Sequence, residues 1–300
     1  MLMTISSIGL ATQVGANTII YHIKVPPSEW KQMYKESKSD KAKEVDINFA
    51  PFAVAQQKAD AGALYQVNAQ QVGFTVYEHK NFGLAVSITQ NAIDDNLYEN
   101  DIFKMSAAAK SSIQVCEDIQ GAIMFNNGHD AANLMYDGYP LFAPQRATLN
   151  GGITGNTAAN LIGLNEAGLE TSIIGIYNFL NDAGQPMTLR SRKLITSSQG
   201  NMMNAERLLN SRSRTETSNN EISAIYERKD VPDGYFPYRY LVDPNQWFML
   251  SDILEGNRYF LRKSLEVRQL TDPSSFITTL GYVIRFSFGC SDWRNQYGSN

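Results

Sequence analysis

Histidine and cysteine are scarce in this sequence. Its 300 residues include only His22, His79 and His129, and only Cys116 and Cys290. Two distant cysteines cannot form a disulfide framework, and neither has a metal-binding neighbour at the usual spacing. Histidine is also the side chain that enzymes use most for proton transfer near neutral pH. The composition therefore argues against catalysis, and we expect no metal and no cofactor.

Long apolar runs and an excess of positive charge are missing as well. No apolar run approaches the ~20 residues that cross a bilayer, and residues 1–14 lack the basic and apolar regions of a signal peptide. The 26 basic and 30 acidic residues give a formal net charge of −4, whereas a dedicated nucleic-acid binder is normally basic. We expect neither a membrane partner nor sequence-specific binding of DNA.

Common catalytic motifs are absent too. The patterns GxGxxG, GxxxxGK[ST], HExxH and GxSxG do not occur. Asp94 and Asp95 are the most tempting pair of carboxylates, but adjacent acids before a helix usually stabilise its dipole. A cytoplasmic hydrolase that uses Asp94 or Asp95 with His79 is kept as an alternative, and changing both aspartates to asparagine would abolish its activity. The favoured hypothesis is that the chain is not an enzyme.

Hydrophobic periodicity predicts an α+β chain, because strands precede and follow helices without regular alternation. Apolar residues at steps of three and four form one predicted stripe on a helix from about 97 to 126: Ile102, Met105, Ala109, Ile113, Cys116, Ile119 and Ile123. Further helices are predicted at 29–43, 166–181 and 201–210. Strands are predicted at 45–49, 64–67, 74–89, 193–196, 221–226, 238–243, 246–250, 259–270 and 276–288, the last two antiparallel.

The segment 45–74 is predicted to form a long hairpin with a polar tip. A two-stranded ribbon is marginal in water unless something covers it. It therefore either folds back on its own domain or lies on another molecule. The preceding residues 1–44 cannot form a core of their own.

Several stretches resemble the major capsid proteins of tailed bacteriophages, which have the Hong Kong 97-type fold. They are YKESKSDKAKEVDINFAPF (34–52), FTVYEHKNFGLAVSITQNAIDDN (74–96), DGYPLF (137–142), YLVDP with WF (240–248) and RFSFGCSDWR (285–294). The last stretch is the most specific and is similar to the ending of the Mu-like major head subunit branch. Each motif is weak alone, but together they cover nearly the whole chain.

The resemblance implies an N-terminal arm (1–44), an extended loop over a neighbouring subunit (45–74) and a peripheral domain in two parts. The first part is 75–187, with a spine helix at about 97–126, and the second is 256–300. Residues 188–255 would be the axial domain at the centre of each capsomer. The implied function is self-assembly, through pentamers and hexamers, into an icosahedral shell around double-stranded DNA. The implied localisation is the virion, after assembly in the cytoplasm of a bacterial host.

The resemblance also implies partners and contact residues. Some family members begin with a scaffolding segment that a protease removes; here fewer than 50 residues precede the loop, so we expect a separate scaffolding protein and no extensive cleavage. A portal and a decoration protein are further expected partners. The candidate intersubunit contacts are Lys58, Asp60, Arg212, Arg214, Glu216 and Trp30. A lysine–asparagine cross-link is not predicted, because Lys58 lacks a matching asparagine and acid.

Two other assembling proteins are kept as alternatives. A cellular nanocompartment shell would share the fold and enclose a cargo enzyme. A tail or head-completion protein would form a ring, but such proteins are usually shorter and few have so long a helix.

Overall fold

The computed structural model describes residues 26–299, with gaps at 53, 59, 61, 90–97, 159, 161, 214–221, 254 and 273–276. The helices are α3 Tyr98–Asn126, α4 Glu166–Tyr177, α5 Met202–Asn210 and α6 Ala224–Arg228, and the 3-10 turns are η1 Glu29–Gln32 and η2 Trp293–Asn295. The strands are β1 Lys35–Lys38, β2 Lys43–Phe49, β3 Gln71–Glu78, β4 Lys80–Thr89, β5 Arg146–Ala147, β6 Ile153–Thr154, β7 Ser191–Ser197, β8 Tyr235–Tyr238, β9 Trp247–Ser251, β10 Asn257–Thr271, β11 Ile277–Cys290 and β12 Gln296–Ser299.

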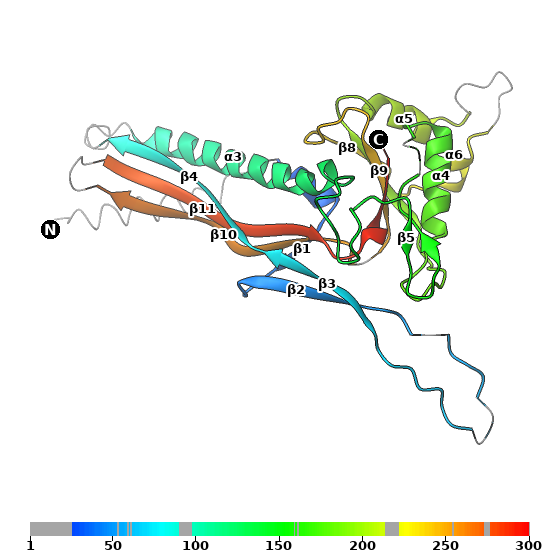
Figure 1. Cartoon of the computed structure of the whole chain (residues 1–300). Coiled ribbons are helices and arrows are strands. Elements are labelled where there is room, and N and C mark those ends of the chain that lie inside the picture. Colours follow the sequence, from blue (N-terminus) through cyan, green and yellow to red (C-terminus); the bar gives the residue numbers. More distant parts are fainter. Residues whose placement is uncertain are drawn as a thin grey trace.

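A four-stranded sheet in the order β1-β10-β11-β4 forms the elongated half of the molecule, and α3 runs along one of its faces (Figure 1). Side chains of β11 alternate between buried and half-buried positions, as expected for a strand with one face on a core. Its Tyr282 and Phe286 join Ile113 of α3 in one buried cluster. The predicted long helix and the antiparallel C-terminal strands are confirmed.

A second sheet, in the order β12-β9-β7-β8, forms the other half with α4, α5 and α6. Leu169 and Ile176 of α4 pack with Trp247 and Trp293 in a separate buried cluster. The expected boundaries place residues 166–177 in the peripheral domain. These residues pack instead on the second sheet. The terminal strand β12 also belongs to this sheet, paired with β9. Packing therefore divides the chain differently from the expected boundaries at 188 and 256.

A two-stranded ribbon, β2 paired with β3, leaves the first sheet and continues into a long extended loop (Figure 1). The predicted hairpin therefore exists, although no strand forms at 64–67. The predicted strand 74–89 is divided at His79 into β3 and β4. This residue is the point at which the chain passes from the ribbon to the sheet.

Three further local predictions are wrong. Residues 29–43 form η1 and then β1, because Lys35–Lys38 pairs in parallel with Arg258–Leu261 and this tertiary pairing overrides a weak helical propensity. The sequence predicts a strand at 221–226, but Ala224–Arg228 forms the helix α6. The Ser223 hydroxyl caps the N-terminus of this helix by accepting a hydrogen bond from the Tyr226 amide. The strand expected at 238–243 lies earlier, at Tyr235–Tyr238.

Candidate assembly surface

The ribbon turns its polar side chains toward its own chain. Ser291 Oγ donates to Asp46 Oδ2 at 2.5 Å, and Asn48 Nδ2 donates to the Ser291 carbonyl at 3.0 Å. Arg258 lies 3.4 Å from the same Asp46 carboxylate. These contacts fix the root of the ribbon on the C-terminal end of β11. The polar side chains of β2, Asp46 and Asn48, are therefore hydrogen-bonded within the chain.

The apolar half of the pattern faces solvent. Val45, Ile47 and Phe49 of β2 and Phe74 and Val76 of β3 are between 39% and 58% exposed. Val45 pairs with Val76, and Ile47 pairs with Phe74, so these side chains lie together on one side of the ribbon. We call these five residues the ribbon face. A strand usually turns its apolar residues to its own core, and the opposite arrangement here marks a surface made for another molecule.

His79 holds the junction between ribbon and sheet through both ring nitrogens. Its Nε2 lies 3.0 Å from Ser39 Oγ, and its Nδ1 lies 3.0 Å from Ser287 Oγ. Ser39 Oγ already donates its only proton to Glu44 Oε1 at 2.7 Å. The Nε2 atom must therefore be the donor, and in the neutral ring Nδ1 then accepts from Ser287 Oγ.

The surroundings of His79 favour this neutral form. Burial lowers the pKa of the imidazole, and the positive charges of Arg285 and Arg262 lower it further, while Glu44 opposes them. The Arg285 side chain also donates to the His79 carbonyl at 3.2 Å. An added proton would thus sit in a buried site with two guanidinium groups nearby.

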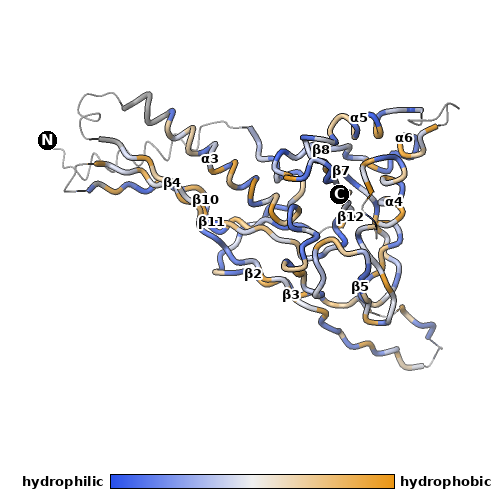
Figure 2. The backbone as a smooth tube through the Cα atoms, turned by 45° about the horizontal axis from the view of Figure 1, so that its top comes forward, coloured by the Kyte–Doolittle hydropathy of each residue, from blue (hydrophilic) through white to orange (hydrophobic). Residues whose placement is uncertain are grey.

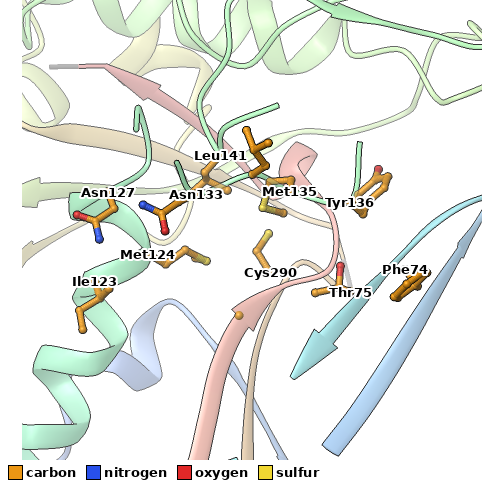
Figure 3. Close-up of a pocket in the computed structure, with 12 residues that line it drawn as sticks. Phe74, Thr75, Ile123, Met124, Asn127, Asn133, Met135, Tyr136, Leu141 and Cys290 are labelled. Atoms are coloured by element: carbon orange, nitrogen blue, oxygen red, sulfur yellow. The ribbon is translucent and has the colours of Figure 1, made fainter. Parts of the chain in front are cut away.

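A recess of about 350 Å³ opens beside the root of the ribbon, between β3, the end of α3 and the loop at 133–136 (Figure 3). Figure 3 shows the sulfur-containing side chains of Met124, Met135 and Cys290 gathered at its centre. No charged residue is among the twelve that line it. Burial raises the pKa of Cys290 to about 12, so the thiol stays protonated. The recess suits an apolar side chain rather than chemistry on a substrate.

A second apolar surface lies along the exposed side of α3, and at Ile123 it meets the recess. Ala109 and Ile113 of the predicted stripe are buried, but Ile119 and Ile123 are 45% and 42% exposed. The stripe contains several steps of three residues, and each such step falls short of a full turn of about 3.6 residues. The row therefore drifts around the helix and leaves the core. Orange, hydrophobic segments recur along α3 in Figure 2.

Three of the predicted contact residues are exposed, and two lie outside the described residues. Lys58 and Asp60 are exposed in the loop between β2 and β3. Arg212 is exposed and lies 3.7 Å from Glu227. Arg214 and Glu216 lie outside the described residues.

Trp30, a predicted contact between subunits, is instead buried within the chain. Its indole is 2% exposed and stacks on Tyr259, with ring centroids 4.1 Å apart. Its backbone amide donates to the buried Asp118 at 2.9 Å. The side chain anchors η1 on α3 within the chain and is not available to a second copy in this conformation.

Of the three residues of the hydrolase alternative, the structure describes only His79. Asp94 and Asp95 lie outside the described residues, and both ring nitrogens of His79 are engaged by serines. Within the described part of the chain, no group of three or more His, Cys, Asp or Glu side chains could hold a metal ion. None of the described helices is long and apolar enough to span a membrane.

No protein-family model matches the sequence, and no curated protein does. Solved structures do match over nearly the full length. A capsid chain of an empty GTA particle has a TM-score of 0.59 at 9% identity, covering 91% of this chain and 89% of that one. A procapsid chain of bacteriophage JBD30 has a TM-score of 0.52 at 15% identity, covering 99% and 76%. The fold is that of the Hong Kong 97-type capsid proteins.

The Hong Kong 97-type fold was expected from the sequence and is confirmed. It also occurs in the virus-like particle from Pyrococcus furiosus, which matches with a TM-score of 0.51 at 7% identity over 97% of this chain and 98% of that one. At such identities the likeness shows the fold, and the role of the chain must be argued from its own surfaces.

Proposed function

We propose that this chain is the major capsid subunit of a tailed bacteriophage and assembles with copies of itself into a closed icosahedral shell around double-stranded DNA. The ribbon face is the observation that carries the proposal. Its five large apolar side chains have no cover within the described chain, and its polar side is already bonded to β11. A second subunit would supply the missing cover.

The energetics of a shell suit such a surface. Complete burial of one large apolar side chain is worth about 1.5–3 kcal/mol, and those of the ribbon face are already half-buried. Each contact is therefore modest, but every subunit repeats it by symmetry, and linked contacts reinforce one another. Subunits can then associate reversibly while the closed shell is stable.

The parts of the fold take the roles that the resemblance implies, with two changes, because α4 and β12 move to the axial domain. We assign α3 and the first sheet to the peripheral domain, and the second sheet with α4 to the axial domain of a pentamer or hexamer. Residues 45–74 act as the extended loop and those before them as the arm. Lys58, Asp60 and Arg212 remain candidate contacts between subunits.

The proposal includes partners beyond the chain itself. A separate scaffolding protein would guide assembly, a portal would occupy one vertex, and a decoration protein would bind outside. DNA would be held by confinement, which requires no strongly basic lining and is compatible with a net charge of −4. The mature subunit would reside in the virion after assembly in the bacterial cytoplasm.

Particle size tests the proposal. The chain, expressed alone and with a candidate scaffold, should give closed shells or defined pentamers and hexamers by light scattering and negative-stain microscopy. A stable 33.5 kDa monomer under both conditions would contradict it. The contents of the particles distinguish this proposal from the nanocompartment alternative. Particles from infected cells should contain double-stranded DNA rather than a cargo enzyme.

A further inference from the structure

The uncovered side of α3 forms a narrow strip of six residues. Its large members are Val115, Ile119 and Ile123, which are between 40% and 45% exposed. Its small members are Ala108, Ser112 and Cys116, of which the first two are exposed and the third is half-buried. We call these six residues the α3 strip. It extends ~22 Å along the helix at a rise of about 1.5 Å per residue.

The α3 strip contains no charged residue, although the same stretch of helix has three. Glu117 accepts a hydrogen bond from the Tyr259 hydroxyl at 2.6 Å, and Asp118 accepts one from the Trp30 amide. Both therefore point into the chain, and the helical repeat places Lys110 on the same half. A solvent-facing helix surface normally carries the charges. Here they are turned inward, and the outer surface is left uncharged.

Large and small residues of the α3 strip are placed in a self-complementary order. When two copies of the helix run antiparallel about a two-fold axis, Ile123 comes level with Ala108 of the other copy. Ile119 comes level with Ser112, and Val115 with Cys116. Each large side chain thus meets a small one, as close packing of helices requires.

We infer that the α3 strip is a contact between two copies of this chain, related by a two-fold axis between Val115 and Cys116. A two-fold contact pairs each residue with a different residue of the other copy, as Ile123 with Ala108, and a strip without charges sets no like charges against each other there. A charged partner would find no complementary group there. This inference rests on the proposed self-assembly, which brings the copies together, but concerns a surface distinct from the ribbon face.

The contact is expected in the assembled shell rather than in a free dimer. Three half-exposed apolar side chains per copy bury far less than the ~1,600 Å² of a standard stable interface. Subunits of adjacent capsomers meet across two-fold axes in a closed icosahedral shell, where other contacts hold them in place. The α3 strip would then fix the geometry of that meeting rather than drive assembly.

Cys116 provides a natural reporter. The proposed axis places the two Cys116 side chains on the same side of the helix pair, within one residue of the axis. The chain's other cysteine, Cys290, is 3% exposed and should not react with the reagent. Assembled particles treated with a short bismaleimide should therefore yield mostly cross-linked dimers in a denaturing gel, and Cys116→Ser particles should yield none. Particles of normal size without a dimer band would overturn the inference and leave the proposed function standing.

Exchanging the large residue Ile119 and the small residue Ser112 tests the pairing between the two copies. Ser112→Ile should place isoleucine against Ile119 of the other copy, and Ile119→Ser should remove the large partner. Each single variant should lower the cross-linked fraction several-fold, and the double variant should restore it. Ile174→Ser, at an exposed isoleucine of α4, is the matched control and should leave cross-linking unchanged.

Each outcome of this exchange decides the question. Melting temperatures of the unassembled variants show whether each one folds. A double variant that folds and assembles but does not regain the dimer contradicts the two-fold pairing. Protection of Cys116 from a monofunctional maleimide without any dimer band would assign the α3 strip to another partner, such as a scaffold, and would also overturn the inference.

Discussion

At the scale of single residues, His79 shows how one side chain can couple the ribbon to pH. In the neutral ring Nε2 donates to Ser39 and Nδ1 accepts from Ser287. Protonation would turn the acceptor Nδ1 into a donor and force the Ser287 hydroxyl to rotate. The junction between ribbon and sheet is thus best bonded when His79 is neutral.

The sign of the resulting pH dependence follows from the lowered pKa of His79 in the folded chain. The unfolded chain takes up the proton near the ordinary value of about 6.5, so it binds more protons than the folded chain just below that pH. Stability from this site is therefore full above about pH 6.5 and is lost as the pH falls below it.

His79→Gln should remove this contribution, because the glutamine amide can donate and accept without titrating. Urea unfolding of the unassembled chain between pH 5 and 8 measures it, and the free energy of unfolding should fall less steeply toward acid pH in the variant. Burial also lowers the pKa of His129, so His129→Gln is measured alongside to separate its contribution from that of His79. Equal slopes for wild type and His79→Gln would contradict the assignment.

At the scale of elements, the ribbon separates stability from assembly. Ile47→Asp puts a charge on the ribbon face at a side chain that is 47% exposed. The free energy of unfolding of the single chain should change by no more than about 0.5 kcal/mol, as for most surface substitutions. Assembly should be reduced strongly, because the charge would be buried unpaired against the next subunit.

Ile153→Asp on β6 is the matched control, since Ile153 is 66% exposed in another two-stranded sheet. Sedimentation of both variants beside wild type gives the fraction of chains in particles. Normal particles from Ile47→Asp would show that the ribbon face is not an assembly contact.

The elements also show what the sequence could predict. The helix α3 and the pair β10–β11 have long and regular apolar patterns, so their existence and pairing are predictable. The strand β1 is not, because KESK has no apolar period and forms only by pairing with β10. Counting the steps of three along α3 could have shown that Ile119 and Ile123 leave the core. Which side of the ribbon faces solvent could not be predicted, since the apolar side needs a second molecule.

At the scale of the whole molecule, the C-terminal residues join the two sheets. The strand β11 belongs to the first sheet and β12 to the second, with only η2 between them. Within this connection Trp293 lies between two guanidinium groups, those of Arg146 and Arg294, each 4.4 Å from its ring centroid. Arg294 also donates to Asp182 at 2.7 Å. The two halves are therefore held by cation–π and ionic contacts as well as by the chain itself.

Gly298 is a tightly packed point of this junction, and it supports a prediction about the molecule as a whole. A Cβ at Gly298 of β12 would overlap with the ring of Phe142, which packs in the first cluster. Gly298→Ala should therefore separate the two halves slightly and lower the free energy of unfolding by about 1–3 kcal/mol, as overpacking of a core does. Gly163→Ala, where a Cβ meets nothing within 4 Å, should be nearly neutral. Chemical unfolding of the unassembled chain compares the two, and equal stabilities would mean that the two halves are not packed tightly against each other at this point.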